Sequence, residues 1–441
     1  MHEVDLPLWS VLPFVALLLS IALLPLAAPH WWESNAHKGI VAALFGVPTA
    51  LWVGLALGDL GRHELAEKAH EYVAFVLLLG SLFAITGNVH VRGSLAGTPL
   101  VNTGVLALGG ALASVIGTTG ASVLLIRPLL RANAPRRDKT HVVVFFIFVV
   151  SNCGGLLTPL GDPPLFLGFL KGVPFEWTFS LWKEWLFVNV ALLAIFNVWD
   201  QRALGREERE RPGSQLEAVL EHEPLRVEGK RNALFLLGVV ATIYAAGSGL
   251  GTGGAPWPFG LQEALMACLA AASWVGTPAR IRAANGFDFH PIAEVAVLFA
   301  GIFATMPPAL LLLNAHAGTL GVDAPWEFFW ATGVLSAFLD NAPTYLTFAA
   351  TACGLADIPL EGRYLAAFLA SAPRATEVLA AISCGAVFMG AATSIGNGPN
   401  FMVKAIAERD GVAMPSFFGF LGWSTAVLGP LMLACTWLFF A

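Results

Sequence analysis

Charged side chains are scarce in this chain of 441 residues: Asp, Glu, Lys and Arg make up 12% of it, whereas hydrophobic residues make up 56%. A soluble domain carries about a quarter charged residues, because its surface must face water. A chain as apolar as this one therefore has lipid as its main solvent. The formal net charge of −6 is spread over a long chain and gives no indication of a nucleic-acid partner.

Cysteine is also sparse, and its positions lack the spacing of a metal site. We interpret the cysteines as small apolar residues inside helices, rather than as disulfide or metal ligands. The five are Cys153, Cys268, Cys353, Cys384 and Cys435. No Lys or Arg precedes the first apolar run, so the basic region of a cleaved signal peptide is missing there. We expect that run to remain as a membrane span.

Enzyme motifs are missing from the sequence. It contains neither the H-E-x-x-H motif of zinc peptidases nor the G-x-S-x-G motif of serine hydrolases. It also has no paired Asp-rich motif that would hold magnesium and a diphosphate. We therefore expect that the protein is not an enzyme.

Long apolar runs dominate what is present. About twenty apolar residues are needed for a helix to cross the hydrocarbon core of a bilayer. Runs of this kind are 8–28, 39–58, 71–90, 177–198, 232–249, 260–278, 291–313 and 416–440.

Four further segments are apolar but interrupted. Gly, Pro and polar residues break 142–170 and 376–404 near the middle, which predicts two discontinuous helices. A polar break inside 100–131 and another inside 326–352 predict two re-entrant hairpins, each entering and leaving by one face. The sequence thus predicts an all-α membrane protein with ten spans and two hairpins.

Lys and Arg are distributed unevenly over the predicted loops. Five lie in the stretch 126–141 and seven in 199–231, which is the one long hydrophilic run of the chain. Short loops rich in these residues tend to stay in the cytoplasm. We therefore expect 199–231 to be a charged cytoplasmic linker, with or without a surface helix, and both termini to lie outside.

The two halves of the chain resemble each other in sequence. S-V-I-G-T-T-G-A-S (114–122) aligns with S-A-F-L-D-N-A-P-T (336–344), and T-P-L-G-D-P-P-L-F (158–166) aligns with T-S-I-G-N-G-P-N-F (393–401). Because each half holds five spans, the second copy lies upside down relative to the first. That arrangement is the inverted-repeat plan of secondary transporters.

The duplication defines the predicted organisation of the chain. The first transmembrane repeat is 1–198, the charged linker is 199–231 and the second inverted repeat is 232–441. Two similar units of opposite topology can exchange shapes, which gives access from either side of the membrane in turn.

The two broken segments carry most of the expected chemistry. An interrupted backbone persists in hydrocarbon only where it is buried or lines a polar cavity. A Pro/Gly turn at the membrane surface is the alternative, but it does not explain two breaks in matching places. Carbonyl, hydroxyl and carboxylate oxygens suit a small cation such as sodium. The candidate ligands are Ser151, Asn152, Thr158, Gly161 and Asp162 in the first break, and Ser383, Thr393, Ser394 and Asn397 in the second.

The hairpin tips should supply the rest of the cavity. Their candidates are Thr118, Thr119 and Ser122 in the first tip, and Asp340, Asn341 and Thr344 in the second. A carboxylate inside a bilayer is a functional candidate by default, so Asp162 and Asp340 are the predicted sodium ligands. Burial disfavours the ionised form and a bound cation favours it, so a proton and a sodium ion would compete. The alternative role for either Asp, and above all for Asp340, is to cap a half-helix, and both roles can coexist.

Lys171 and Lys404 follow the two breaks by similar distances. Either could neutralise a carboxylate in the site. A long lysine side chain near a helix end more commonly reaches back to the membrane interface, and we expect that for both.

These interrupted motifs resemble those of the ion transporter superfamily, which includes NhaD-type sodium/proton antiporters, citrate and dicarboxylate transporters, and arsenite permeases. The residues that carry the resemblance are Ser151-Asn152, Thr158-Pro159-Leu160-Gly161-Asp162, Leu339-Asp340-Asn341-Ala342-Pro343-Thr344 and Thr393-Ser394-Ile395-Gly396-Asn397. With the order of spans and hairpins, the resemblance extends over nearly the whole chain. It is most similar to the NhaD-type branch, whose members are often labelled as citrate transporters.

The resemblance implies a fold of two inverted repeats, a scaffold of the first spans holding a mobile transport unit, and a homodimer. Carboxylate transporters of the superfamily carry Ser-Asn-Thr at the hairpin tips, whereas this chain has G-T-T-G and D-N-A-P there. An added aspartate opposes an anion and favours a cation. Asn397 stands where the first repeat has Asp162, so the predicted site has one acid from each half.

We therefore expect exchange of sodium, or another monovalent cation, for protons by elevator-type alternating access, with no cofactor besides the transported ions. The alternative is transport of citrate, another carboxylate or arsenite, which would require Arg127 and Lys404 to point into the cavity. A channel fits two discontinuous helices with hairpins less well. We expect a multi-pass protein of the inner (plasma) membrane of a bacterium.

Overall fold

A computed structural model describes residues 6–441 except 214–222, 254, 256 and 259. Within these residues, nine helices are long and apolar enough to cross a membrane. The protein is an all-α membrane protein, as the composition predicts. One of the nine is α5 (Pro99–Ile116), which forms the first arm of a hairpin and is not a separate span in the predicted plan.

The eight uninterrupted apolar runs predicted from the sequence all fall on helices. The first half of the chain forms η1 (Leu8–Val11), α1 (Leu12–Ala27), α2 (Pro29–Trp32), α3 (Asn35–Ala56), α4 (Gly58–Gly87), α5, α6 (Thr118–Ala132), α7 (Thr140–Val149), η2 (Cys153–Leu157), α8 (Pro163–Leu170), η3 (Phe175–Leu181) and α9 (Trp182–Glu210). Here η denotes a short 3-10 or π helix.

The second half begins with α11 (Asn232–Gly247) and α12 (Leu261–Gly276), each of 16 residues and therefore about 24 Å long. It continues with α13 (Ala279–Ala284), α14 (His290–Ala315), η4 (Ala317–Thr319), α15 (Pro325–Phe338), α16 (Asn341–Leu355), α17 (Tyr364–Ser371), α18 (Pro373–Met389), η5 (Gly390–Ala392), α19 (Gly398–Arg409), α20 (Phe417–Cys435) and η6 (Thr436–Phe440).

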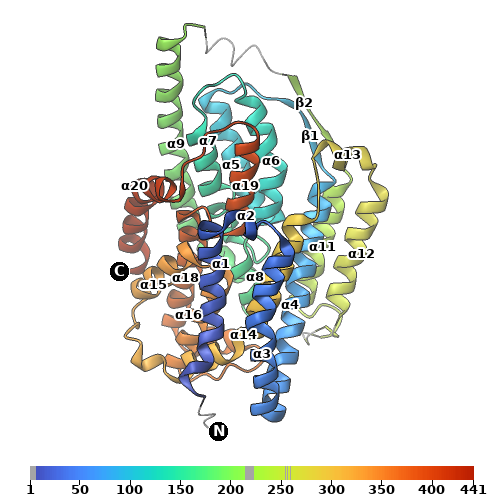
Figure 1. Ribbon diagram of the computed structural model, residues 1–441, viewed down its shortest axis with the longest axis vertical. Helices are drawn as coiled ribbons and strands as arrows, with labels where there is room; N and C mark the ends of the chain where they lie inside the picture. The colour runs from blue at the N-terminus through green and yellow to red at the C-terminus, as the bar shows by residue number, and fades with distance from the viewer. Residues whose placement is uncertain (1–5, 214–222, 254, 256, 259) are drawn as a thin grey trace.

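The helices form two groups side by side (Figure 1). A lateral group contains α3, α4, α11, α12 and α14, which pack on one another. A hairpin group contains α5 to α8 and α15 to α19, with both hairpins and both interrupted segments. The two groups meet where α4 contacts α6 and α8, and where α14 contacts α16.

The interrupted helices α7 and α18 occupy the centre of the hairpin group. Every residue from Val142 to Val150 is at most 1% exposed, because α7 is apolar on all its faces. In α18, Gly385 lets the helix approach α15 closely, since a Cβ there would overlap the carbonyl oxygen of Phe329. Helix α18 is buried in the same way from Ala381 to Met389, whereas Arg374 and Glu377 in its first turn are exposed.

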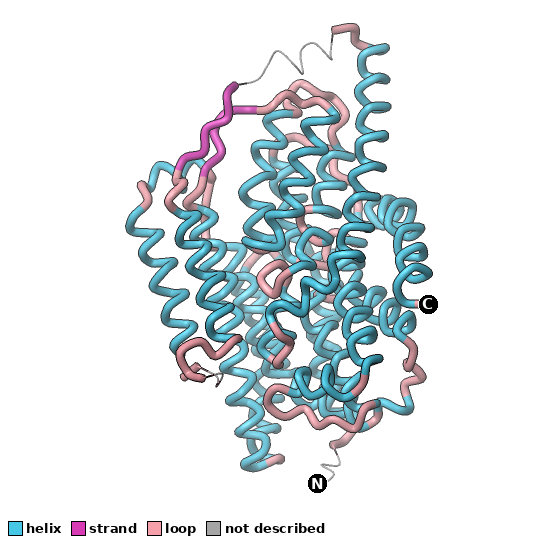
Figure 2. The backbone as a smooth tube through the Cα atoms, turned by 180° about the vertical axis from the view of Figure 1, so that it is seen from behind, coloured by secondary structure: helices cyan, strands magenta, loops and turns pink. Residues whose placement is uncertain are grey.

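The two hairpins approach the centre from opposite ends of the molecule. In Figure 1 the arms of α5–α6 lie in the upper half and those of α15–α16 in the lower half. The loops that interrupt the helices lie at mid-height inside the bundle, as Figure 2 shows. The tips and the breaks therefore lie in the same layer of the protein.

The predicted linker 199–231 differs in part from the structure, because α9 continues to Glu210. One face of this extension packs on the α6–α7 loop, where Glu207 accepts a hydrogen bond from the backbone amide of Arg137 (3.0 Å). Later in the linker, β2 (Glu223–Glu228) pairs antiparallel with β1 (His90–Ser94), a sheet that the sequence did not predict. Residues 214–222 of the linker lie outside the described residues.

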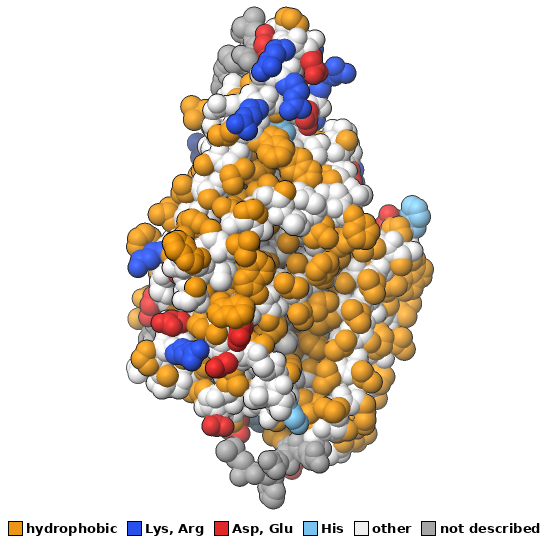
Figure 3. Space-filling view, turned by 90° about the vertical axis from the view of Figure 1, so that its left-hand side faces the viewer, with side chains coloured by type: hydrophobic (Ala, Val, Ile, Leu, Met, Phe, Trp, Pro, Cys, Tyr) orange, Lys and Arg blue, Asp and Glu red, His pale blue; other side chains and the backbone are white. Residues whose placement is uncertain are grey.

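Charged side chains, basic ones with acidic ones among them, gather at the upper end of the molecule, above a broad apolar surface (Figure 3). This end includes the exposed Arg202, Arg206 and Arg209 of α9. The first described residues of the chain lie at the opposite end (Figure 1).

A buried polar network fixes α9 against the first hairpin. Arg136 Nη1 lies 2.6 Å from Asp200 Oδ1, and His141 Nε2 lies 2.8 Å from the same oxygen. Asn102 donates to Asp200 Oδ2 (3.0 Å) and forms a mutual amide pair with Asn133. Asp200 is fully buried and Arg136 is 3% exposed, so each charge depends on the other for compensation.

We expect Asp200→Ala to destabilise the protein by about 3–5 kcal/mol, because it leaves the Arg136 charge buried without its partner. Thermal unfolding in detergent measures the effect. Asp138→Ala is the control: its side chain is 66% exposed and lies 3.9 Å from His141, so its loss should cost less than about 1 kcal/mol. Equal melting temperatures for the two variants would contradict the structural importance of the network.

Candidate functional site

The first interruption places Asp162 at the start of a short buried helix. After α7 ends, the chain turns through η2 and reaches Asp162 in an extended conformation, with φ −140° and ψ 144°. Pro163 follows as the first residue of α8, where a missing backbone amide costs nothing. The Asp162 carboxylate is thereby held in the interior, and the residue is 1% exposed.

Three neutral groups donate hydrogen bonds to this carboxylate. Thr118 Oγ1 from the first hairpin tip donates to Oδ1 (2.9 Å). Asn341 Nδ2 from the second tip donates to Oδ2 (2.5 Å), and Asn397 Nδ2 from the second break donates to Oδ1 (3.2 Å). All four segments singled out from the sequence therefore meet at one side chain.

A second set of contacts surrounds the carboxylate. Asn397 Nδ2 also lies within hydrogen-bond distance of Asn152 Oδ1 (3.3 Å) and of the Ser151 carbonyl oxygen (3.4 Å). Asn152 donates to Asn400 Oδ1 (2.7 Å), and the hydroxyls of Ser151 and Ser122 lie 2.8 Å apart. Asn400 was not among the predicted site residues, although it lies in the same interrupted run.

The two interruptions share the same local hydrogen bonds. Thr158 Oγ1 donates to the carbonyl of Ser114, and Thr393 Oγ1 donates to that of Ala337 (2.5 Å). Each hydroxyl also accepts from the backbone amide two residues later, at 3.1 Å in the first break and 3.3 Å in the second. Thr158 and Thr393 thus anchor the breaks to the hairpins and do not contact Asp162 in this conformation.

Matching glycine pairs allow both breaks to close tightly. A Cβ at Gly161 would overlap the carbonyl oxygen of Gly155, and one at Gly396 would lie 2.6 Å from the carbonyl oxygen of Gly390. The carbonyl of Gly161 also accepts from the backbone amide of Thr118 (2.8 Å), which joins the break to the hairpin tip.

Asp340 caps the second hairpin helix. Its Oδ1 accepts from the backbone amide of Ala342 (3.0 Å), as the capping alternative required. It is half-buried and makes no hydrogen bond to Asp162. Asn341, the next residue, is the one that reaches the Asp162 side chain.

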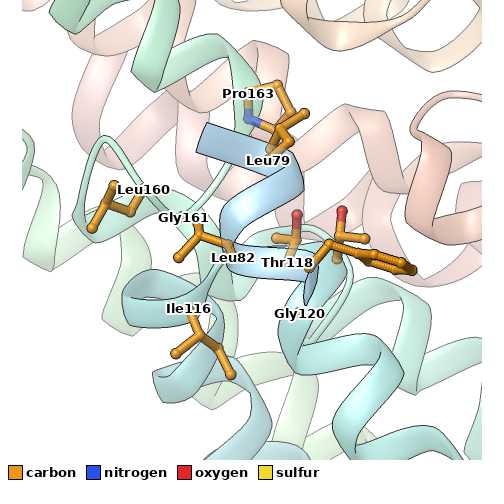
Figure 4. Close-up of a pocket in the computed structure, with 11 residues that line it drawn as sticks. Leu79, Leu82, Ile116, Thr118, Gly120, Leu160, Gly161 and Pro163 are labelled. Atoms are coloured by element: carbon orange, nitrogen blue, oxygen red, sulfur yellow. The ribbon is translucent and has the colours of Figure 1, made fainter. Parts of the chain in front are cut away.

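The remaining predicted residues have other surroundings. Thr344 and Ser383 donate to backbone carbonyls of their own helices, at 2.9 Å and 2.7 Å. Ser394 is buried beside Thr393. Thr119 lines a small cavity where α4 meets the first hairpin tip, together with Leu79, Leu82, Thr118, Gly161 and Pro163 (Figure 4).

Basic side chains do not enter this site. In the described part of the chain, no Lys, Arg or His donates to Asp162 or to the residues that contact it. Arg127 lies against Gly286, near Asp288 and Asp410, and Lys404 faces Glu408 of its own helix at 3.9 Å. The oxygens available to a cation are those of Asp162, the Thr118 hydroxyl, the Ser151 carbonyl and Asn341 Oδ1, which is buried without a hydrogen-bond partner.

The chain matches, over residues 3–440, the model of a family described as "Putative citrate transport". It belongs to this family. No curated protein matches the chain. Membership in this family makes the protein a secondary transporter of the membrane, which agrees with the ion transporter resemblance.

The expected placement of Lys171 at the membrane interface is wrong. Lys171 is 3% exposed and forms an ion pair with Glu71 of α4, a residue that sequence reasoning did not place in the interior. A lysine just after an apolar helix has the same local pattern whether it reaches the interface or pairs inside. Which of the two occurs depends on whether the neighbouring helix, here α4, places an acidic residue within reach.

We expect Gly161→Ala to destabilise the protein by about 3 kcal/mol or more, because the added methyl overlaps the Gly155 backbone, which cannot move aside. Gly398→Ala is the matched control in the second interruption, since a Cβ at Gly398 meets open space. The yield of monodisperse protein after detergent extraction, together with its melting temperature, provides the measurement. Similar values for both variants would show that the first break tolerates a wider separation between residue 161 and the Gly155 backbone.

Proposed function

We propose that this protein exchanges sodium, or another monovalent cation, for protons, and that Asp162 binds either ion in turn. The observation that carries the proposal is the environment of the Asp162 carboxylate. It is 1% exposed and receives hydrogen bonds from three neutral donors. A permanent cationic partner is missing from the described residues around it.

Neutral donors offset only part of the cost of burying a charge. A lysine or arginine partner would hold Asp162 ionised at all times and leave no role for a mobile ion. Without one, the remaining negative charge is compensated by a proton or by a bound cation. Because one carboxylate cannot favourably hold both, each ion displaces the other, and that competition is sufficient for exchange.

The composition of the site suits a small hard cation. Sodium would bind to oxygen atoms, and the Asp162 carboxylate, the Thr118 hydroxyl and the amide oxygen of Asn341 are such atoms. The unpartnered Asn341 Oδ1 is a buried acceptor next to the carboxylate, which supports a bound cation in this region.

We extend the proposal to the transport cycle. Two inverted repeats, 1–198 and 232–441, are supported by the matching hydrogen bonds and glycine pairs of the two breaks. The hairpins that enter from opposite ends support the same conclusion. In an elevator cycle the hairpin group would move along the lateral group. The basic upper end would face the cytoplasm, and a homodimer in a bacterial inner membrane completes the proposal.

We expect sodium or lithium to dissipate a pH gradient in inverted vesicles that contain the protein, and Asp162→Asn to reduce this response to that of vesicles without it. The substitution keeps the size of the side chain but removes the group that takes up the proton. A pH-sensitive fluorescent dye measures the gradient. Asp357→Asn is the control: Asp357 is an exposed acid beyond α16, and its loss should leave exchange unchanged. Normal exchange by Asp162→Asn would end the proposed role of Asp162.

The second candidate function is citrate transport, which the description of the family favours. Citrate carries up to three negative charges, and the described site offers it no basic side chain. An anion would require Arg127 and Lys404, but Arg127 lies against Gly286 and Lys404 lies 3.9 Å from Glu408 of its own helix.

We therefore expect proteoliposomes containing the protein to take up no more labelled citrate than empty liposomes, with or without a sodium gradient. Addition of sodium to the same preparation should drive proton movement, which shows that the protein is active. Saturable citrate uptake without cation-dependent proton movement would favour the second candidate over the first.

A further inference from the structure

A cluster of charged residues lies at the opposite end of α8 from Asp162. This ion cluster consists of Glu67, Lys68 and Glu71 of α4 together with Lys171, the residue that ends α8. Lys171 Nζ pairs with Glu71 and lies 3.7 Å from Glu67 Oε2. Lys68 Nζ lies 3.0 Å from Glu71 Oε2, and Lys68, Glu71 and Lys171 are each at most 7% exposed.

The cluster joins the lateral group to the hairpin group. Lys171 is fixed within the hairpin group, because its carbonyl oxygen accepts from the backbone amide of Leu365 (3.0 Å). Its ammonium lies 5.3 Å from the centre of the Tyr364 ring. The charge that compensates it, Glu71, belongs to α4 on the other side of the boundary.

The helix between Lys171 and Asp162 is short and firmly packed. Eight residues of α8 separate the two side chains, a length of about 12 Å. A Cβ at Gly168, the sixth residue of this helix, would overlap the hydroxyl of Tyr345 in α16. Any movement of Lys171 relative to α4 is therefore transmitted to Asp162.

The surroundings of the cluster are incompletely packed. A small cavity adjoins it, lined by Glu64, Lys68, Pro307, Leu310 and Tyr364. The Tyr364 hydroxyl is buried and has no hydrogen-bond partner. If the ion pair served only to stabilise the fold, we would expect the buried Tyr364 hydroxyl to have a hydrogen-bond partner and the cavity to be filled. An ion pair that opens and closes needs unfilled space beside it.

We propose that the Lys171–Glu71 ion pair is a positioning contact that holds α8, and with it Asp162, in one of two arrangements against α4. This inference rests on the proposed alternating-access function. The ion pair must open for Asp162 to become accessible from the other side of the membrane. A buried ion pair adds little net stability compared with apolar packing, but it strongly favours the one geometry in which both charges are compensated. Glu71 and Lys171 act through the placement of α8 and do not contact the transported ion.

The test measures how readily a labelling reagent reaches the boundary between the lateral group and the hairpin group from each side of the membrane. No transported ion is needed. Leu79→Cys places a thiol in the cavity between α4 and the first hairpin tip, in a chain whose exposed cysteine is removed by Cys268→Ser. A membrane-impermeant maleimide is added to right-side-out and to inverted vesicles, and the ratio of the two labelling rates is the readout.

We expect Glu71→Gln to change this ratio by about tenfold or more, because the lost pair stabilises only one of the two arrangements. Lys171→Arg, which retains the charge, should keep the ratio of the parent chain. Lys171→Gln, which removes the other charge of the pair and leaves Glu71 with Lys68, should change the ratio in the same direction as Glu71→Gln.

Glu294→Gln is the matched control. It breaks a second lysine–glutamate pair, Lys38–Glu294 (2.7 Å), whose two helices both belong to the lateral group. We expect it to leave the labelling ratio unchanged.

An unchanged ratio in Glu71→Gln, or an equal change in Glu294→Gln, would overturn the proposal. If Glu71→Gln fails to fold, Lys171→Gln decides, since an unchanged labelling ratio in that variant would also overturn the proposal. A clear shift in a protein that exchanges no cation for protons would support the positioning contact and refute only the proposed function.

Discussion

The packing of the two halves depends on one buried carboxylate. In hydrocarbon, Asp162 cannot draw its hydrogen bonds from water, so the protein must supply them. It does so from three segments that are far apart in the sequence, through Thr118, Asn341 and Asn397. Because each donor lies at a helix end or hairpin tip, the tips and breaks have to meet in one layer. The arrangement of the hairpin group follows from that requirement.

The same rule governs the backbone at the two breaks. A broken helix leaves amides and carbonyls that need partners. Here the hydroxyls of Thr158 and Thr393 each accept from a nearby amide and donate to a hairpin carbonyl. The glycine pairs allow the strands of each break to approach closely enough for these bonds. These bonds give partners to backbone groups that the interruption would otherwise leave unpaired, which favours its persistence in a bundle surrounded by lipid.

Much of this could be predicted from the sequence, because apolar length and Gly/Pro interruption are local signals. They locate the helices, the breaks and the four segments that meet at Asp162. Contacts between distant segments leave no such signal: Lys171 next to Glu71, the Asp200 network and the β1–β2 pairing each depend on a neighbour brought close by the fold. The extension of α9 was missed for a related reason, since its charged sequence indicates a solvated linker until the α6–α7 loop covers one face.

The two aspartates that the sequence predicts as sodium ligands differ in their hydrogen-bond partners. Asp340 accepts from the Ala342 amide at the start of α16, so a helix N-terminus stabilises its negative charge. The residue in the corresponding place of the second break is Asn397, which is neutral and donates to Asp162. A backbone amide thus stabilises the charge of Asp340, whereas the three side chains that donate to Asp162 are all neutral. That asymmetry between otherwise matching halves is the reason that we assign the proposed ion exchange to Asp162, which precedes the short helix that ends at Lys171.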